Sequence, residues 1–370
     1  MYNTVIIRYG EIFLKSEFIR REFEKKLIRN IKKRIGDASI FRKRHRIYIK
    51  TENAKEVSER LKTVFGIVSV SPAIKTDANV ENITEISLAL AKKIIRPGER
   101  FAVRAERSGR HDFSSKDIEN LVGEEILNSI HGRVDLENPD KTIFIEVRDD
   151  LAFIFDKKIK GLGGLPYKSQ GRLIALLSTG IDSPVAAWMM MRRGCEIVVL
   201  HLGNVNEIKE IMNRLEFFTD EKIKSYIIPY DKILEKISEH SGRYTCIVCK
   251  RFMYRIAERI AEIENAHGIV TGENIGQVAS QTLENLKVIN CLDIPVYMPL
   301  VGMDKEDIIK IAKDIGTYGL VKGKKCDYIP KKPVTRSSEE IITKIEEEMG
   351  IERFIENVQD NFILKKGPSR

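Results

Sequence analysis

The 370-residue sequence predicts an α/β protein whose C-terminal half is a doubly wound parallel sheet, preceded by smaller α+β domains. Two observations carry this prediction. After Arg172, short apolar segments alternate with amphipathic ones, which is typical of a parallel sheet with helices on both faces. The order of elements before Gly161 is different and mixes hairpins with helices. In the later half we expect strands at 173–177, 196–202, 224–228 and 268–271, and helices at 184–193, up to about 218 and at about 249–263.

The first 74 residues show the order strand, helix, strand, strand, helix, strand, which is that of a ferredoxin-like unit. Ser16 is expected to cap its first helix. A second α/β segment follows, and Gly161–Pro166 is rich in turn-forming residues, which indicates a domain linker. The expected elements are strands at 5–9, within 39–49, at 67–74, 100–106, 142–147 and 151–155, and helices at 16–34, 54–65, 80–95 and 115–130.

The positive charge of the chain is concentrated at its N-terminus. Residues 1–50 hold 15 Lys and Arg against 5 Asp and Glu, whereas residues 171–370 hold 29 of each kind. The net charge of +9 therefore comes from the first fifty residues. This pattern favours a basic surface that meets a polyanion, and a solvated lysine-rich helix is the alternative.

The composition argues against a membrane-spanning or disulfide-stabilised protein. The longest uncharged runs, 173–181 and 183–191, are far shorter than the roughly 20 apolar residues of a membrane helix. The N-terminus has no secretory pattern, so we expect a cytoplasmic protein with no membrane partner. Five cysteines are too few for a disulfide scaffold, which leaves reduced thiols with metal or redox chemistry.

One loop carries most of the predicted chemistry. The strand ending at Leu177 runs into Ser178-Thr179-Gly180-Ile181-Asp182-Ser183, and Pro184 is expected to open a helix at its first position. Such a turn directs backbone N–H groups and a helix N-terminus at an anion, which suits a di- or triphosphate. The Walker pattern is absent from the sequence, so kinase-like chemistry is not supported. A simple strand-to-helix turn is the alternative.

This loop resembles the SGGxDS signature of the PP-loop ATP pyrophosphatases, with Thr179 in place of the first glycine. The resemblance implies that ATP is cleaved between its α- and β-phosphates. It also implies that Asp182 takes part in Mg²⁺-assisted activation, and that Ser178, Gly180 and Ser183 contact the phosphates.

Four further segments narrow the resemblance. Residues 271–283 are similar to the TGE-x-x-GQVASQTL segment of the tRNA 4-thiouridine synthetases, also called tRNA sulfurtransferases, and residues 299–305 and 315–318 match the same family. Phe101 to Arg104, with the polar residues up to Ser115, resembles the RNA-binding THUMP domain. The chain is identified as a member of this family. The resemblance implies an adenosine pocket and nucleotide contacts formed by Leu176, Leu177, His201, Leu202, Lys250, Gly272 and Gln281. The leucines also fit a plain apolar strand, and His201 also fits a hydrogen-bonded core histidine.

Three cysteines form a candidate catalytic and metal-binding set. Cys246 and Cys249 lie one turn apart near an expected helix start, where the helix dipole favours a thiolate, and basic neighbours favour one at Cys326. Three thiols suit an iron–sulfur cluster, and archaeal-type family members carry such a set; zinc with His240 as a fourth ligand, or a simple thiol pair, is the alternative. Cys195 and Cys291 are expected to be small buried hydrophobic residues.

The sulfur source follows from the same resemblance. Bacterial relatives often append a rhodanese domain, but 44 residues follow Cys326, so we expect sulfur to come from elsewhere. Sulfide bound at a cluster is the preferred donor. A persulfide on Cys246 or Cys249, or a persulfide-carrying partner protein, is the alternative.

The predicted domains and function can then be stated together. We expect a ferredoxin-like domain at 1–54, a THUMP domain at 55–158, a linker at 159–170, a PP-loop catalytic domain at 171–336 and a helical tail at 337–370. The resemblance implies ATP-dependent formation of 4-thiouridine at position 8 of tRNA through an adenylated uridine. Sulfur transfer to a carrier protein for thiamine synthesis, or a non-catalytic RNA-binding role, is the alternative, and a homodimer is left open.

Overall fold

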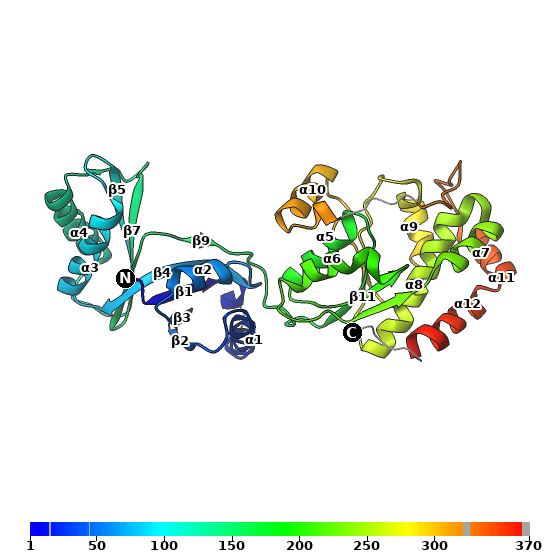
Figure 1. Cartoon of the computed structure of the whole chain (residues 1–370), viewed down its shortest axis with the longest axis horizontal. Coiled ribbons are helices and arrows are strands. Elements are labelled where there is room, and N and C mark those ends of the chain that lie inside the picture. Colours follow the sequence, from blue (N-terminus) through cyan, green and yellow to red (C-terminus); the bar gives the residue numbers. More distant parts are fainter. Residues whose placement is uncertain (15, 44, 321–325, 365–370) are drawn as a thin grey trace. The chain divides into compact units, whose positions relative to one another are not determined.

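The computed structural model describes all residues except 15, 44, 321–325 and 365–370. The chain forms two compact units, Met1–Pro166 and Tyr167–Arg370. Figure 1 shows α/β architecture in both, which confirms the predicted fold class. The division between the units falls within the stretch 159–170 that was expected to be a linker.

The first unit is built on a sheet whose described strands follow the order β2-β3-β1-β4-β8-β7-β5-β6, with β9 paired to β4. β1 lies antiparallel between β3 and β4, as in a ferredoxin-like unit, whereas β5 and β7 are parallel. The elements are β1 (Thr4–Tyr9), η1 (Glu11–Leu14), α1 (Glu17–Ile35), β2 (Ser39–Lys43), β3 (Arg46–Lys50), α2 (Ala54–Leu61), β4 (Ile67–Asp77), α3 (Val80–Ile94), β5 (Arg100–Ser108), α4 (Ser115–Ile130), β6 (Arg133–Val134), β7 (Lys141–Arg148), β8 (Leu151–Phe155) and β9 (Ile159–Lys160).

The long strand β4 joins the two halves of this unit, because its first residues pair with β1 and its last residues with β8. Ser16 occupies the N-cap position of α1, but its side chain makes no capping hydrogen bond, unlike Ser114, which forms a full capping box at α4. The two-residue strands β6 and β9 were not predicted, since they are too short to show a periodic pattern.

Part of the N-terminal positive charge is neutralised inside the first unit. Glu146 on β7 is 1% exposed and accepts a 2.8 Å hydrogen bond from Nε of Arg8 and a 3.1 Å bond from Arg148. Arg46 lies 3.5 Å from the same carboxylate. The excess of positive charge counted in residues 1–50 is therefore larger than the positive charge that these residues can present to a partner.

The second unit contains a parallel sheet in the order β12-β11-β10-β13-β14. The strand order reverses between β10 and β13, so the C-terminal ends of these two strands form the switch point where such sheets bind ligands. The elements are β10 (Arg172–Leu176), α5 (Asp182–Arg192), β11 (Glu196–Leu202), α6 (Val205–Glu216), β12 (Ser225–Ile228), α7 (Asp231–Ser241), η2 (Gly242–Tyr244), α8 (Thr245–Glu264), β13 (Ile269–Val270), η3 (Ala279–Gln281), α9 (Leu283–Ile289), β14 (Val296–Tyr297), α10 (Lys305–Asp314), η4 (Tyr318–Leu320), α11 (Glu339–Met349), α12 (Ile351–Val358) and the π-helix η5 (Gln359–Leu364).

Two predicted helix starts were wrong by a few residues. α5 begins at Asp182, so Pro184 is its third residue; proline is tolerated there because the first four N–H groups of a helix have no intrahelical partner. α8 begins at Thr245, ahead of Cys246, so both cysteines of the CxxC pair lie inside the helix.

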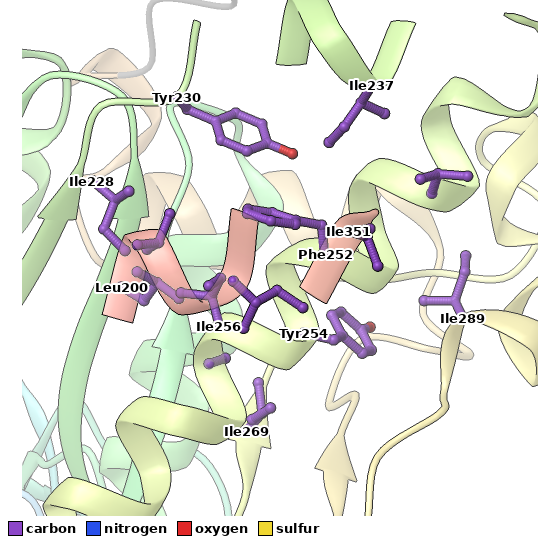
Figure 2. Close-up of a cluster of buried hydrophobic side chains, with 14 of the residues drawn as sticks. Leu200, Ile228, Tyr230, Ile237, Phe252, Tyr254, Ile256, Ile269, Ile289 and Ile351 are labelled. Carbon is purple, nitrogen blue, oxygen red and sulfur yellow. The ribbon is translucent and has the colours of Figure 1, made fainter. Parts of the chain in front are cut away.

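The C-terminal helices pack into the core of the second unit. Figure 2 shows Ile351 among the buried side chains of α8, including Phe252, Tyr254 and Ile256. Glu346 of α11 accepts hydrogen bonds from Nε and Nη2 of Arg251 on α8 at 2.8 and 3.0 Å, and both side chains are 3% exposed. The segment after 337 therefore stabilises the helix that carries the CxxC pair.

Candidate functional site

A cavity of about 590 Å³ opens at the C-terminal ends of the strands of the second unit. Its position at the switch point agrees with the ligand site of doubly wound sheets. Most of the residues predicted for the site line it: Leu176, Leu177, Ser178, Gly180, Asp182, Ser183, His201, Leu202, Lys250, Gly272, Gln281 and Cys326.

The loop after β10 is held in a compact turn by its two serines. The backbone N–H of Ser178 donates to Oγ of Ser183 at 2.8 Å, and the two hydroxyl oxygens lie 2.9 Å apart. The N–H of Gly180 donates to Oγ of Ser178 at 3.2 Å. The loop leads into the N-terminus of α5, whose positive dipole end and unpaired N–H groups suit an anion such as a pyrophosphate.

Gly272 lets the segment after β13 approach this loop closely. A Cβ atom on Gly272 would lie 2.8 Å from the backbone N of Ser183 and 2.9 Å from the carbonyl carbon of Asp182. No side chain fits at that distance without backbone movement. Gly272 therefore completes the wall of the cavity, and its contact with a nucleotide stays a prediction.

His201 both lines the cavity and serves the core. Its Nδ1 lies 2.9 Å from the carbonyl oxygen of Leu177, and its Nε2 lies 3.3 Å from Oε2 of Glu207. The ring is 4% exposed. The plain interpretation, a hydrogen-bonded core histidine, holds alongside its place in the cavity wall, because the ring ties β11 to the strand end that enters the loop.

Several polar groups face the cavity. Nζ of Lys250 lies 3.4 Å from Oε1 of Glu273, and both side chains are largely buried. Oε1 of Gln281 is buried without a hydrogen-bond partner within the described ranges. Such an acceptor is costly to leave unsatisfied, so a water molecule or a ligand in the cavity can donate a hydrogen bond to it.

Asp182 is paired with a cation that the sequence interpretation did not assign. Nζ of Lys305, the first residue of α10, lies 2.6 Å from Oδ1 of Asp182 and 3.3 Å from Oε1 of Gln277. The family resemblance includes residues 299–305, but nothing local links Lys305 to a loop 123 residues earlier. A lysine beside the phosphate-binding loop can neutralise charge on a bound polyphosphate.

The three predicted cysteines lie near one end of the cavity. Cys326 lines it, and Sγ of Cys249 is 3.0 Å from the hydroxyl of Tyr230, another lining residue. Burial raises the pKa of Cys246, and it raises the pKa of Cys249 to about 12. This direction is opposite to the thiolate expected near a helix start, because burial disfavours the charged form of each thiol.

In the part of the chain that the structure describes, no three His, Cys, Asp or Glu side chains are arranged to hold a metal ion. His240, considered as a zinc ligand, is exposed and its Nδ1 lies 2.8 Å from the carbonyl oxygen of Lys236. Cys195 is buried as expected, whereas Cys291 is only half-buried, which corrects the second of those two expectations.

Comparison with known proteins agrees with this geometry. The family model described as "Thiamine biosynthesis protein (ThiI)" matches residues 168–351, the "ThiI ferredoxin-like domain" matches 4–71 and the "THUMP domain" matches 77–156. A "Probable tRNA sulfurtransferase" of Methanobrevibacter smithii is 40% identical, and the alignment covers 94% of each chain. One of Thermococcus kodakarensis is 41% identical over 93% of this chain and 96% of its own.

The chain belongs to the tRNA sulfurtransferase family. A solved structure of a 4-thiouridine synthetase–RNA complex with bound ATP matches it with a TM-score of 0.89, 32% identity and 98% coverage of both chains. A solved Pyrococcus horikoshii protein matches with a TM-score of 0.68, 30% identity, and 85% and 99% coverage.

The structure adds several residues to the site of this tRNA sulfurtransferase family member that the sequence analysis did not identify. Glu207 orients His201, Glu273 pairs with Lys250, and Tyr230 contacts Cys249. Tyr328 lines the cavity two residues after Cys326. Asn204 caps α6 at the rim of the cavity. The sequence could have indicated this cap, because Asn204 is followed three residues later by Glu207, as in a capping box.

No described helix is long and apolar enough to cross a membrane.

Proposed function

We propose that this chain is an ATP-dependent tRNA sulfurtransferase that forms 4-thiouridine at position 8 of tRNA through an adenylated uridine. The observation that carries the proposal is the close contact between Gly272 and the Ser178–Ser183 loop at the switch point of the parallel sheet. It creates a cavity with a phosphate-binding loop on one wall and polar side chains on the other. The related 4-thiouridine synthetase with RNA and bound ATP supports the same reaction.

Different residues of the cavity bind different parts of ATP in this proposal. In this proposal the loop N–H groups and the N-terminus of α5 hold the β- and γ-phosphates, while Lys305 neutralises their charge from the side of α10. Leu176, Leu202 and the apolar edge of His201 surround the adenosine. Gln281 supplies its unsatisfied carbonyl oxygen as an acceptor.

The reaction then proceeds in two displacements. O4 of the uridine attacks the α-phosphorus of ATP, the bond to pyrophosphate breaks, and the N3 proton is lost. Hydrosulfide adds to C4, the C4–O bond breaks, AMP leaves, and the sulfur-bound proton moves to N3. Adenylation is needed because the carbonyl oxygen is a poor leaving group and AMP is a good one. Holding both reactants in one cavity supplies the orientation that each displacement requires.

Asp182 is the proposed ligand of a Mg²⁺ ion that accompanies ATP. A carboxylate at the start of α5, 28% exposed on the cavity side, is the hard oxygen donor that Mg²⁺ prefers beside phosphates. When bound, the ion would withdraw charge from the phosphates. In its absence the ion pair with Lys305 compensates the same carboxylate.

Cys246, Cys249 and Cys326 are the proposed ligands of an iron–sulfur cluster, with a persulfide on Cys246 or Cys249 as the alternative. Three soft thiol donors near one end of the ATP cavity fit such a cluster chemically. As arranged, the described side chains do not yet form a metal-holding group, so binding would require Cys249 to exchange its contact with Tyr230 for a metal. A bound cluster would supply or carry sulfide beside the activated base.

The remaining partners belong to this same proposal. tRNA is the substrate, sulfide or a persulfide-carrying protein is the sulfur donor, and the cytoplasm is the proposed compartment. Sulfur transfer to a carrier protein for thiamine synthesis is not favoured, because the relatives bear the name tRNA sulfurtransferase and the first unit matches the THUMP domain.

Substitution of Asp182 tests the assignment of the loop. Asp182→Ala should lower tRNA thiolation by at least about 100-fold while the affinity for tRNA stays within about twofold of wild type. Asp314→Ala, which removes an exposed carboxylate at the end of α10, is the matched control. Wild-type thiolation by Asp182→Ala would remove the loop from the mechanism.

The cysteine assignment is tested by iron and acid-labile sulfide analysis of anaerobically purified protein. Cys326→Ala should lose bound iron, whereas Cys195→Ala, at a buried cysteine outside the site, should retain it. Full iron content in Cys326→Ala would exclude the three-cysteine cluster. Zinc in place of iron in the wild-type protein would exclude it as well.

A further inference from the structure

A second cavity, of about 650 Å³, adjoins the ATP cavity of the second unit. The two share a wall, because Asp327 and Tyr328 line both. The other lining residues come from the end of α7, from η2 and from the segment that follows Tyr328: Ser238, Gly242, Arg243, Ile329, Pro330, Lys331 and Lys332. Nothing in the proposed reaction has used this cavity so far.

Cations outnumber carboxylates among the residues that line the second cavity. Arg243, Lys331 and Lys332 line it against a single lining carboxylate, that of Asp327. All three cations are exposed, and their head groups form no ion pair with the described residues. Some other cations of this unit are paired, such as Arg255 with Glu346 and Glu352. An unpaired cationic group in a concave site attracts an anion from solution.

The segment that carries the two lysines is anchored to the core. The N–H of Val334, which is 6% exposed, donates to the carbonyl oxygen of Arg243 at 3.3 Å. Nδ2 of the buried Asn285 donates to the carbonyl oxygen of Val334 at 2.9 Å, and its Oδ1 accepts from the hydroxyl of Ser337 at 2.7 Å. Lys331, Lys332 and Arg243 are therefore held at one place on the surface.

We propose that this second cavity binds the backbone phosphates that flank the target uridine of the RNA substrate, with Tyr328 as the aromatic surface on which the uridine stacks as it enters the ATP cavity. The inference rests on the proposed function and specifies how its substrate is held. The base that reacts must reach the ATP cavity, so its own phosphates must lie just outside. Tyr328 is half-buried, and cations beside an accessible aromatic ring are the usual means of binding unpaired nucleotides.

An acidic partner protein that delivers sulfur is the competing occupant. The wall shared with the ATP cavity favours RNA, because a base extruded from its helix spans the short way from backbone to reaction centre. ATP itself has a separate place for its phosphates at the Ser178–Ser183 loop.

The first test removes the two lysines from the full-length chain. Lys331→Ala/Lys332→Ala is compared with Lys209→Ala/Lys310→Ala, which removes the same charge from exposed positions on α6 and α10. With free sulfide as donor, the first variant should raise the KM for tRNA about tenfold and lower the slope of log Kd against log salt by about 1 to 2. The Kd for ATP should not change, and the control should match wild type.

The second test examines the stacking surface. Tyr328→Ala should weaken tRNA binding by roughly 5- to 150-fold, and Tyr328→Phe, which keeps the ring, should retain wild-type affinity. An equal loss of ATP affinity in Tyr328→Ala would assign the ring to the nucleotide pocket and overturn the stacking role.

The remaining outcomes separate this inference from the proposed function. If wild type thiolates tRNA and the lysine variant does so with an unchanged KM and salt slope, the second cavity does not bind RNA and the proposed function stands. A defect that appears only with a persulfide-carrying protein as donor would assign the cavity to that protein. Absence of thiolation in the wild type would refute the proposed function, while the binding measurements still decide the role of the cavity.

Discussion

Replacement of Gly272 by alanine tests the contact on which the ATP cavity depends. The added Cβ would lie 2.8 Å from the backbone N of Ser183, 2.9 Å from the carbonyl carbon of Asp182 and 3.0 Å from Cα of Ser183. All three are backbone atoms, so no side-chain rotation relieves the overlap. One of the two segments must move.

The structure indicates which segment yields. The end of β13 is fixed by the buried Val270 and by the hydrogen bond from the N–H of Thr271 to the carbonyl oxygen of Tyr297 at 3.1 Å. The phosphate-binding loop is more exposed, and its internal bonds tie Ser183 to Ser178. We expect the loop to move as a whole, which displaces its N–H groups from the phosphates.

Overpacking of this kind costs about 1–3 kcal/mol, which corresponds to a loss of roughly 5- to 150-fold in ATP affinity if it is expressed in binding. Calorimetric titration of the full-length chain with ATP measures the loss of affinity. If part of the cost destabilises the fold instead, a thermal melt without ATP shows it as a fall in melting temperature of about 2–4 °C per kcal/mol. Gly302→Ala is the control, since a Cβ there meets nothing within 4 Å. Wild-type ATP affinity in Gly272→Ala would refute the steric argument.

Three further predictions concern stability, the nucleotide pocket and RNA binding. Glu346→Ala should lower the free energy of unfolding by about 3–5 kcal/mol in chemical unfolding, because it leaves Arg251 charged and buried. Glu348→Ala, at an exposed carboxylate of the same helix, should change it by less than about 0.5 kcal/mol. Equal effects of the two substitutions would contradict a structural role of α11. Without ATP, Gln281→Leu should leave the melting temperature unchanged or raise it. The same substitution should weaken ATP binding by about 1–3 kcal/mol, because the unsatisfied oxygen is lost. Unchanged ATP affinity would show that this oxygen does not contact the ligand. Binding of tRNA, followed by fluorescence anisotropy, should weaken steeply with salt, with a slope of log Kd against log salt of at least about 3; a flat response would remove the argument from the basic N-terminal residues.

The order of elements and the position of the Ser178–Ser183 loop between β10 and α5 were predictable, because both depend on local patterns. The strand from Leu173 and the helix after Asp182 follow from apolar periodicity and from a turn of small residues. The helix start was misplaced by two residues, since proline is acceptable anywhere in the first turn. The domain boundary near residue 55 stays a prediction; in the structure, α2 and β4 pack on the same sheet as β1.

The residues of the candidate site that follow strand ends could be predicted from the sequence. The properties of its residues that depend on burial could not. Leu176, His201 and Gly272 all line the cavity as expected, because the ends of parallel strands meet at one edge of the sheet. The protonation state of the CxxC thiols was not predictable, since a helix start and partial burial act on the thiol pKa in opposite directions. Burial prevails at Cys249, which contacts Tyr230.

Local sequence patterns were enough to predict the α/β class, the position of the loop and the family, because periodicity, turn residues and motif spacing are properties of short segments. Four contacts could be recognised only in the folded chain: Lys305 pairs with Asp182, Gly272 packs against Ser183, Glu346 of α11 binds Arg251, and Tyr328 lines two cavities. Each of these contacts joins segments far apart in the chain. Their existence depends on how helices and strands pack around a shared core, which no local pattern records.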